Sequence, residues 1–269
     1  MITGVRIDRR DDLPRLLDDG RVRARLRRWP GSPEIAHLIL ADHTRPPGQR
    51  TLDEWLGMLD HRGFGEIRTG ALAPSATDVF RSRNFRPIQE LVLLQRNLAR
   101  APRGRDGGSA PRVEPLHHEL RALRGRRQLA TAARIDAAAF AIGWHLDEIG
   151  IVDAANATPQ SRVRLAVTSD DEPAGYMITG RNGTAGFVQR LAVDPRFGGR
   201  GVARALLTDG IEWLRRRGAT EVLVNTDLDN DRALDLYSRQ GFRETPERLV
   251  VLARRIDSAS GVVTEANER

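Results

Sequence analysis

Hydrophobic residues recur along the chain at two spacings, and together they predict an α/β protein. Short runs of β-forming residues bounded by Gly, Pro, Asn or Asp predict strands, and apolar residues three or four positions apart predict helices with one buried face. Strands are predicted at residues 5–7, 34–40, 66–72, 88–98, 116–123, 162–168, 174–180, 187–193 and 221–226. Helices are predicted at residues 21–29, 51–61, 75–83 (with Ser75 as the cap), 128–140 and 202–214.

The turn that follows residues 187–193 is rich in glycine and arginine. Residues 196–201 read RFGGRG, and helical spacing starts directly after them. Glycines let a backbone approach a ligand closely, and the free N–H groups at the start of a helix favour negative charge. The turn therefore predicts a phosphate-binding loop, although a glycine turn before a helix also occurs without any ligand. The two common nucleotide loops do not fit, because the chain has no lysine for Gly-Lys-Ser/Thr and the spacing is not GxGxxG.

A second motif follows the loop at a fixed distance. After the strand at residues 221–226, residues 230–242 read NDRALDLYSRQGF, which contains the spacing N-x-x-A-x-x-x-Y-x-x-x-G-F. Together with the R-x-x-G-x-G spacing of residues 196–201, this order resembles the GNAT N-acetyltransferase superfamily. The resemblance covers residues 113–257 and implies the GNAT fold, an α/β (α+β layered) arrangement with a mixed central sheet flanked by helices. It also implies acetyl-CoA as the co-substrate and no metal.

The same resemblance places the cofactor at one end of the sheet and on the loop beside it. The pantetheine arm would pair with residues 191–193 as if it were another strand, and the N–H of Leu191 or Ala192 would donate to the thioester oxygen. The pyrophosphate would be held by the loop and the first helical turn. The cofactor-binding residues expected on this basis are Leu191, Ala192, Val193, Arg196, Gly198, Gly199, Arg200, Gly201, Val202, Ala203, Asn225, Asn230 and Tyr237.

Tyr237 is the expected catalytic residue. Transfer of an acetyl group from a thioester to an amine leaves a thiolate that needs a proton, and a phenol with a reference pKa of about 10 can supply it. A packing role for this aromatic ring is the alternative. Asn230 has two interpretations as well, since it could hydrogen-bond the cofactor arm or cap the helix that it precedes.

The general base is the point at which the chain departs from the family. Many GNAT members carry a glutamate on the central strand just before a Leu-x-Val sequence, where this chain has Gln189-Arg190. A glutamine can orient a water molecule but cannot accept a proton. Asp227, His145 and Glu148 are the other candidates. A water chain, or an amine that is already neutral, is the alternative to a protein base.

The first third of the chain repeats features of the last third. Residues 58–69 align with 213–224, and residues 78–87 align with 235–244, sharing Asp, Phe and Arg. We therefore expect a smaller, degenerate GNAT-like domain ahead of the catalytic one, although two α/β segments can also resemble each other by chance. The expected organisation is a degenerate domain at residues 1–98, a linker at 99–112, a catalytic domain at 113–257 and a tail at 258–269.

The first copy lacks the residues that carry the chemistry. Phe80 stands where Tyr237 stands in the second copy, so the hydroxyl group is missing. The loop at residues 43–48 contains two prolines, which have no N–H to offer a phosphate. We therefore expect one cofactor site, in the second copy.

Composition and charge restrict the partners and the compartment. The chain has no cysteine, so it can form neither disulfides nor a thiol-bound acyl intermediate. No apolar run approaches the roughly 18 residues of a membrane span, and the first residues do not form a secretory signal, so we expect a cytoplasmic protein without a membrane partner. The net charge of +7 comes from arginines that are not clustered with aromatic residues, so we expect no nucleic-acid partner.

These observations predict an N-acetyltransferase that transfers an acetyl group from acetyl-CoA directly to a primary amine. Tandem GNAT enzymes include one that acetylates an amino-sugar conjugate, and this likeness implies a small-molecule amine and a monomeric protein. The missing glutamate leaves a CoA-binding pseudoenzyme or regulatory module as an alternative. Acetylation of protein or peptide N-terminal amines is the other alternative.

Overall fold

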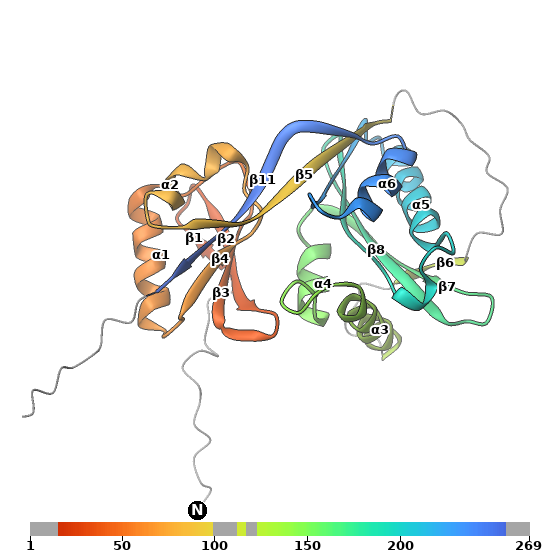
Figure 1. The fold of residues 1–269 in the computed structure, drawn as a ribbon, viewed down its shortest axis with the longest axis horizontal. Helices are drawn as coiled ribbons and strands as arrows, with labels where there is room; N and C mark the ends of the chain where they lie inside the picture. Colours follow the sequence, from red (N-terminus) through yellow and green to blue (C-terminus); the bar gives the residue numbers. More distant parts are fainter. Residues whose placement is uncertain (1–15, 99–111, 117–122, 257–269) are drawn as a thin grey trace, which may run out of the picture. The chain divides into compact units, whose positions relative to one another are not determined.

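The computed structural model describes residues 16–98, 112–116 and 123–256 (Figure 1). The chain divides into two compact units. The first unit comprises Met1–Gln89 and Val250–Arg269, and the second unit comprises Glu90–Leu249. No helix in the described part of the chain is long and apolar enough to span a membrane.

The second unit is built on a mixed sheet whose strands lie in the order β5-β10-β9-β8-β7-β6. Its strands are β5 (Arg86–Asn97), β6 (Arg112–Leu116), β7 (Gln160–Val167), β8 (Pro173–Asn182), β9 (Ala185–Val193) and β10 (Glu221–Asp227). Its helices are α3 (Leu123–Ala139), α4 (Glu148–Ala155), α5 (Val202–Arg216) and α6 (Asp231–Arg239). Strands β9 and β10 are parallel, and the other neighbours are antiparallel.

Helices cover both faces of this sheet, with α3 and α4 on one side and α5 and α6 on the other (Figure 1). Successive side chains of a strand point to opposite faces, so each central strand contributes to two cores. On β8, Tyr176 and Ile178 pack in the cluster beneath α3 and α4. Met177, between them, packs with Leu206 and Leu214 of α5. The predicted order of strands and helices in this half of the chain is confirmed.

The first unit has a smaller sheet in the order β1-β2-β3-β4-β11, with one core beneath its helices. Its strands are β1 (Leu16–Asp18), β2 (Arg23–Trp29), β3 (Ser32–Leu40), β4 (Glu66–Thr69) and β11 (Arg243–Arg255). Its helices are α1 (Gln49–His61), the short 3-10 helix η1 (Pro74–Ala76) and α2 (Asp78–Arg81). Strands β3 and β4 are parallel and are joined through α1, as β9 and β10 are joined through α5.

Strands β5 and β11 each complete the sheet of a unit other than the domain in which the sequence placed them. Residues 91–97 of β5 pair antiparallel with β10, and residues 253–255 of β11 pair antiparallel with β4. The units therefore differ from the predicted domains at residues 1–98 and 113–257. Ladder hydrogen bonds assign residues 90–97 to the second unit and residues 250–255 to the first.

One predicted helix is a strand. Residues 21–29 were expected to form an arginine-rich helix, but residues 23–29 form β2. Ala24 and Leu26, which are two positions apart, are buried, and the arginines on either side of them are not. Burial at every second residue is the period of a strand. Trp29 is buried as well, but it packs against His37 and Arg68 and does not belong to the apolar core of this unit. This additional buried position hides the two-residue period at the sequence level.

Two smaller predictions are also corrected. The strand expected at residues 116–123 lies at Arg112–Leu116, and Leu123 already begins α3. Ser75 caps no helix, because it lies inside η1, and the residue before α2 is Thr77, which makes no side-chain cap. The strand expected at residues 5–7, most of the linker and the tail at 258–269 lie outside the described residues.

The two units share an aromatic pair at matching positions. In the first unit, Phe80 packs edge-on against Phe85 with ring centroids 5.3 Å apart. In the second unit, Tyr237 packs edge-on against Phe242 with ring centroids 5.5 Å apart. In each pair the two residues are five positions apart in the sequence, and each pair follows a parallel β-α-β crossover. This correspondence supports the predicted repeat.

His37 on β3 makes the first unit sensitive to acid. Its ring is half-buried edge-on against Trp29, and its Nδ1 accepts a hydrogen bond from Arg27 Nε (3.2 Å). Burial, with help from the charges of Arg27 and Arg68, lowers the pKa of His37 well below its ordinary value of 6.5. Between pH 6.5 and this lowered pKa, the unfolded chain binds the proton of His37 and the folded chain does not.

We predict that the free energy of unfolding falls as the pH drops below 6.5, by up to about 1.4 kcal/mol per pH unit. His37→Gln should remove this part of the slope, and His61→Gln, at the exposed end of α1, should retain it. Urea denaturation at pH 7.5, 6.0 and 5.0 measures the difference. Equal slopes for wild type and His37→Gln would contradict the prediction.

Candidate active site

The central sheet of the second unit opens between β9 and β10. Among the described residues these strands pair only at their first ends, residues 185–187 against residues 221–223. Both strands continue beyond that point, β9 to Val193 and β10 to Asp227. The facing edges beyond the last pair therefore have no strand between them, and an extended ligand could pair with that backbone. We call this opening the slot.

The backbone of β9 decides which residues face the slot. The N–H of Asp194 donates to Ala174 O on the β8 side (2.9 Å), and backbone groups of successive strand residues point to alternate sides. Leu191 and Val193 therefore direct their N–H and C=O groups toward the slot, while Ala192 directs its own toward β8. Between the two expected donors to a thioester oxygen, this geometry favours Leu191 over Ala192.

A β-bulge lies just before these residues. Ile178 of β8 pairs with Arg190 while the next residue, Thr179, pairs with Val188, so Gln189 has no partner across the ladder. A bulge bends its strand and increases the local twist. The bulge therefore accounts for the divergence of β9 from β10 at this position.

The glycine loop leads from the end of β9 into α5. Gly199 and Gly201 have φ angles of 74° and 81°, a left-handed conformation that side chains rarely tolerate. Gly201 precedes α5 and provides no side-chain cap. The N–H groups of the first turn of a helix have no acceptor within the helix. The predicted loop residues 198–203 thus lie together at a helix N-terminus beside the slot.

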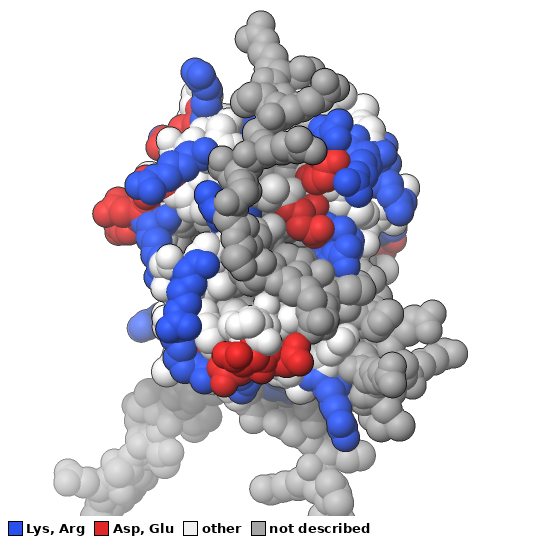
Figure 2. All heavy atoms as spheres, turned by 90° about the vertical axis from the view of Figure 1, so that its right-hand side faces the viewer, with Lys and Arg blue, Asp and Glu red and all other residues white. Residues whose placement is uncertain are grey.

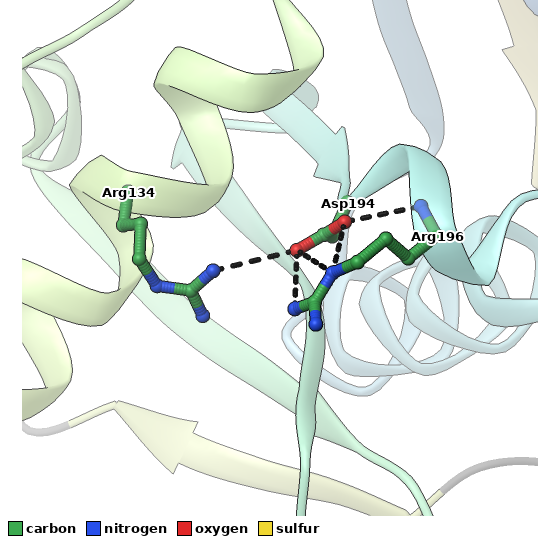
Figure 3. Close-up of polar contacts among 3 residues, drawn as sticks. All are labelled: Arg134, Asp194 and Arg196. Atoms are coloured by element: carbon green, nitrogen blue, oxygen red, sulfur yellow. Dashed lines mark hydrogen bonds and ion pairs between the residues drawn. The ribbon is translucent and has the colours of Figure 1, made fainter.

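Asp194 anchors the start of this loop through arginines (Figure 3). Its buried carboxylate accepts hydrogen bonds from the N–H of Arg196 (3.1 Å) and from Arg196 Nε and Nη2 (3.1 and 2.9 Å). Arg134 of α3 approaches the other side at 3.4 Å. The hydrogen bonds from Arg196 are the main reason that the pKa of Asp194 is lowered. Much of the positive charge of Arg196 is therefore committed to Asp194.

Tyr237 and Asn230 lie on or next to α6. The Tyr237 ring is buried in the core shared with α5, and burial raises the pKa of its phenol, so the group stays protonated. Asn230 acts as the helix cap, since its Oδ1 accepts from Ala233 N (3.1 Å) and its Nδ2 donates to Thr226 Oγ1 (3.2 Å). Asn225 is exposed near the end of β10.

Comparison with known families and structures agrees with this geometry. The profile described as Acetyltransferase (GNAT) family matches residues 130–242, a span that contains β9, the glycine loop, β10 and α6. This part of the chain, residues 130–242, belongs to the GNAT acetyltransferase family. The protein is an acetyltransferase with a tandem arrangement, and the predicted α/β fold with a mixed sheet is confirmed.

One curated relative and two solved structures extend the likeness over most of the chain. The Mycothiol acetyltransferase of Rhodococcus jostii (strain RHA1) is 29% identical over 256 residues, covering 79% of this chain and 81% of that protein. The tandem GNAT protein from the clavulanic acid biosynthesis pathway, determined without AcCoA, superposes with a TM-score of 0.57 at 14% identity, over 89% and 81% of the two chains. The GCN5-related N-acetyltransferase from Kribbella flavida gives a TM-score of 0.58 at 12% identity, over 93% of both chains. At these identities the two structures show the fold alone.

A buried polar network lies under the slot of this GNAT enzyme, and the sequence did not reveal it. Asp136 of α3 has no exposed surface, and its carboxylate accepts from Tyr176 Oη (2.5 Å) and from Arg190 Nε and Nη2 (2.8 and 2.6 Å). The N–H of Leu146 donates to the same carboxylate (2.5 Å), and Arg190 Nη2 also donates to Trp144 O (2.8 Å). The network fixes residues 144–146 against β9.

The network also bears on the missing base. The bulge places Gln189 and Arg190 on the same face of β9, the one covered by α3 and α4, and Arg190 is held by Asp136. His145 lies between two residues that the network binds through their backbones. Glu148 lies in the first turn of α4, and Asp227 ends β10 at the slot. The structure thus brings His145 toward β9 and Asp227 to the slot, and it leaves the base unassigned between them.

Charge on the visible surface is mixed. Figure 2 shows arginine side chains interspersed with aspartate and glutamate rather than gathered into one basic face. Within the described residues, no cluster of three or more His, Asp or Glu side chains could hold a metal ion. Positive charge near the loop is therefore supplied by individual arginines.

We predict that Asp136→Asn destabilises the enzyme by about 3–5 kcal/mol, because it leaves the largely buried Arg190 guanidinium without its counterion. Asp235→Asn is the matched control, since Asp235 pairs with Arg239 on the exposed face of α6 and should cost less than about 0.5 kcal/mol. Urea denaturation followed by circular dichroism measures both. A loss below about 1 kcal/mol for Asp136→Asn would refute a stabilising role of the network.

Proposed function

We propose that this enzyme transfers an acetyl group from acetyl-CoA directly to a primary amine of a small molecule, at the slot of the second unit. The observation that carries the proposal is the continuity of the slot with the glycine loop. A pantetheine arm paired with the free edge of β9 would run straight to the N–H groups at the start of α5, where its pyrophosphate is favoured. A direct transfer fits a chain that has no cysteine to carry the acetyl group.

The proposed roles of individual residues follow from this placement. The N–H of Leu191 donates to the thioester oxygen and stabilises the charge that develops there. The phenol of Tyr237, kept protonated by burial, protonates the departing thiolate. Asn230 acts indirectly, by capping α6 and so fixing the helix that carries Tyr237.

Two observations support a small-molecule acceptor and a single active unit. A curated relative that matches most of this chain is named a mycothiol acetyltransferase. In the first unit the position of Tyr237 is held by Phe80, and Pro46 and Pro47 precede α1, so we assign the reaction to the second unit alone. The protein is proposed to act as a monomer, without metal and without a nucleic-acid partner.

We predict that Gly199→Asp raises the Kd for acetyl-CoA by at least about 100-fold, because it places a carboxylate where the pyrophosphate binds. Gly218→Asp is the matched control: Gly218 has a similar left-handed φ of 81° at the far end of α5 and should leave the Kd within about twofold. Isothermal titration calorimetry measures both. Unchanged binding in Gly199→Asp would place the cofactor elsewhere.

We predict that Tyr237→Phe lowers kcat by about 10² to 10⁴ while the Kd for acetyl-CoA changes less than about threefold, because only the proton donor is removed. Thiol release in an amine library identifies the acceptor first, and the same assay then compares the variant. A variant with wild-type kcat would leave Tyr237 with a packing role only.

A further inference from the structure

The backbone conformation of Gly198 does not require a glycine, but its surroundings leave little space for a side chain. Its φ and ψ of −58° and 144° are open to any residue, unlike those of Gly199 and Gly201. A Cβ added to Gly198 would lie 2.7 Å from Arg232 Nη2, 3.2 Å from Pro195 O and 3.4 Å from Arg232 Nη1. The space over this loop residue is therefore taken by a guanidinium group that belongs to a different element.

Arg232 reaches the loop from the start of α6. It is the second residue of that helix, whose N-terminus is fixed by the Asn230 cap and by its bond to Thr226 at the end of β10. Arg232 is exposed, and among the described residues no carboxylate forms an ion pair with it. Its guanidinium is thus held near the loop with its charge still available.

The other arginines of the loop are engaged differently. Arg196 is bound to Asp194, as described above, and both Arg196 and Arg200 lie over the ring of Phe197 at 5.2 and 5.5 Å from its centroid. Asp194 itself adds a negative charge at the start of the loop. A diphosphate bound at the helix N-terminus would need a further cation to balance it, and a guanidinium donates well to phosphoryl oxygens.

We propose that Arg232 is a phosphate-binding residue of this site, which donates to a phosphoryl oxygen of coenzyme A through the space that Gly198 leaves over the loop. This inference rests on the proposed function. The phosphoryl group is either in the pyrophosphate or at the 3′ position of the adenosine, and both present the same oxygen chemistry to a guanidinium.

The test measures Kd by calorimetry for coenzyme A, 3′-dephospho-coenzyme A and pantetheine with wild type, Arg232→Ala and Arg239→Ala. Arg239 is the matched control, because it is an exposed arginine at the other end of α6 and pairs with Asp235. We expect Arg232→Ala to raise the Kd for coenzyme A about tenfold or more, and Arg239→Ala to change it less than twofold. Binding of pantetheine should be the same in all three proteins.

The dephosphorylated analogue identifies the group that is bound. If Arg232→Ala raises the Kd for 3′-dephospho-coenzyme A as much as that for coenzyme A, Arg232 binds the pyrophosphate. If the variant leaves the Kd for 3′-dephospho-coenzyme A unchanged, Arg232 binds the 3′-phosphate. Gly198→Ala should weaken coenzyme A binding by displacing the guanidinium, and the double variant with Arg232→Ala should bind no more weakly than Arg232→Ala alone.

Two results would overturn the inference while leaving the proposed function intact. In the first, wild type binds coenzyme A and Arg232→Ala binds it equally well. In the second, Arg232→Ala weakens pantetheine as much as coenzyme A, which would show a structural effect without phosphate contact. If wild type binds no coenzyme A, the proposed function fails as well.

Discussion

The site depends on one constraint, which is that β9 and β10 pair over three residues and then separate. At the closed end the strands are drawn tightly together, since a Cβ at Gly186 would lie 2.7 Å from Leu214 of α5 and 3.1 Å from Glu221 O. At the open end the bulge at Gln189 turns β9 away. Unpaired backbone is costly in a protein interior, so such an opening persists only where a ligand or solvent satisfies it. In the proposed reaction, the roles of the glycine loop and of Tyr237 follow from this slot.

Two buried carboxylates support the two sides of this opening. Asp136 ties α3 and the segment before α4 to Arg190 on one face of β9, and Asp194 ties the glycine loop to Arg196. Each acid forms an ion pair with an arginine, Arg190 of β9 for Asp136 and Arg196 of the following turn for Asp194. Removal of Asp136 would leave the largely buried Arg190 without its counterion next to the slot, which couples the stability of the second unit to the shape of its site.

Local patterns allowed much of the site to be predicted from sequence. The strand before the loop at residues 196–201 and the helix after it depend on neighbouring residues, and both are confirmed. The phosphate-binding role of the loop stays a prediction. The Asp136 network was not predicted, because Tyr176 and Arg190 lie 40 and 54 residues away and each looks ordinary in its own strand. Arg232 was not singled out because its closeness to Gly198 is visible only in the structure. The domain bounds were not predicted because strands β5 and β11 carry the same pattern whichever sheet they join. The prediction of a helix at residues 21–29 was wrong because Trp29, buried outside the apolar core of its unit, obscured the two-residue period of the strand.

Amide hydrogen exchange with and without acetyl-CoA, resolved by residue, tests the central claim most directly. The account predicts that the cofactor slows exchange at Leu191 and Val193 and along residues 199–204. It also predicts that Ala192, whose N–H is directed toward β8, changes little. Slowed exchange around Gly48 of the first unit instead, or protection of Ala192 equal to that of its neighbours, would contradict the assignment of the cofactor to the slot.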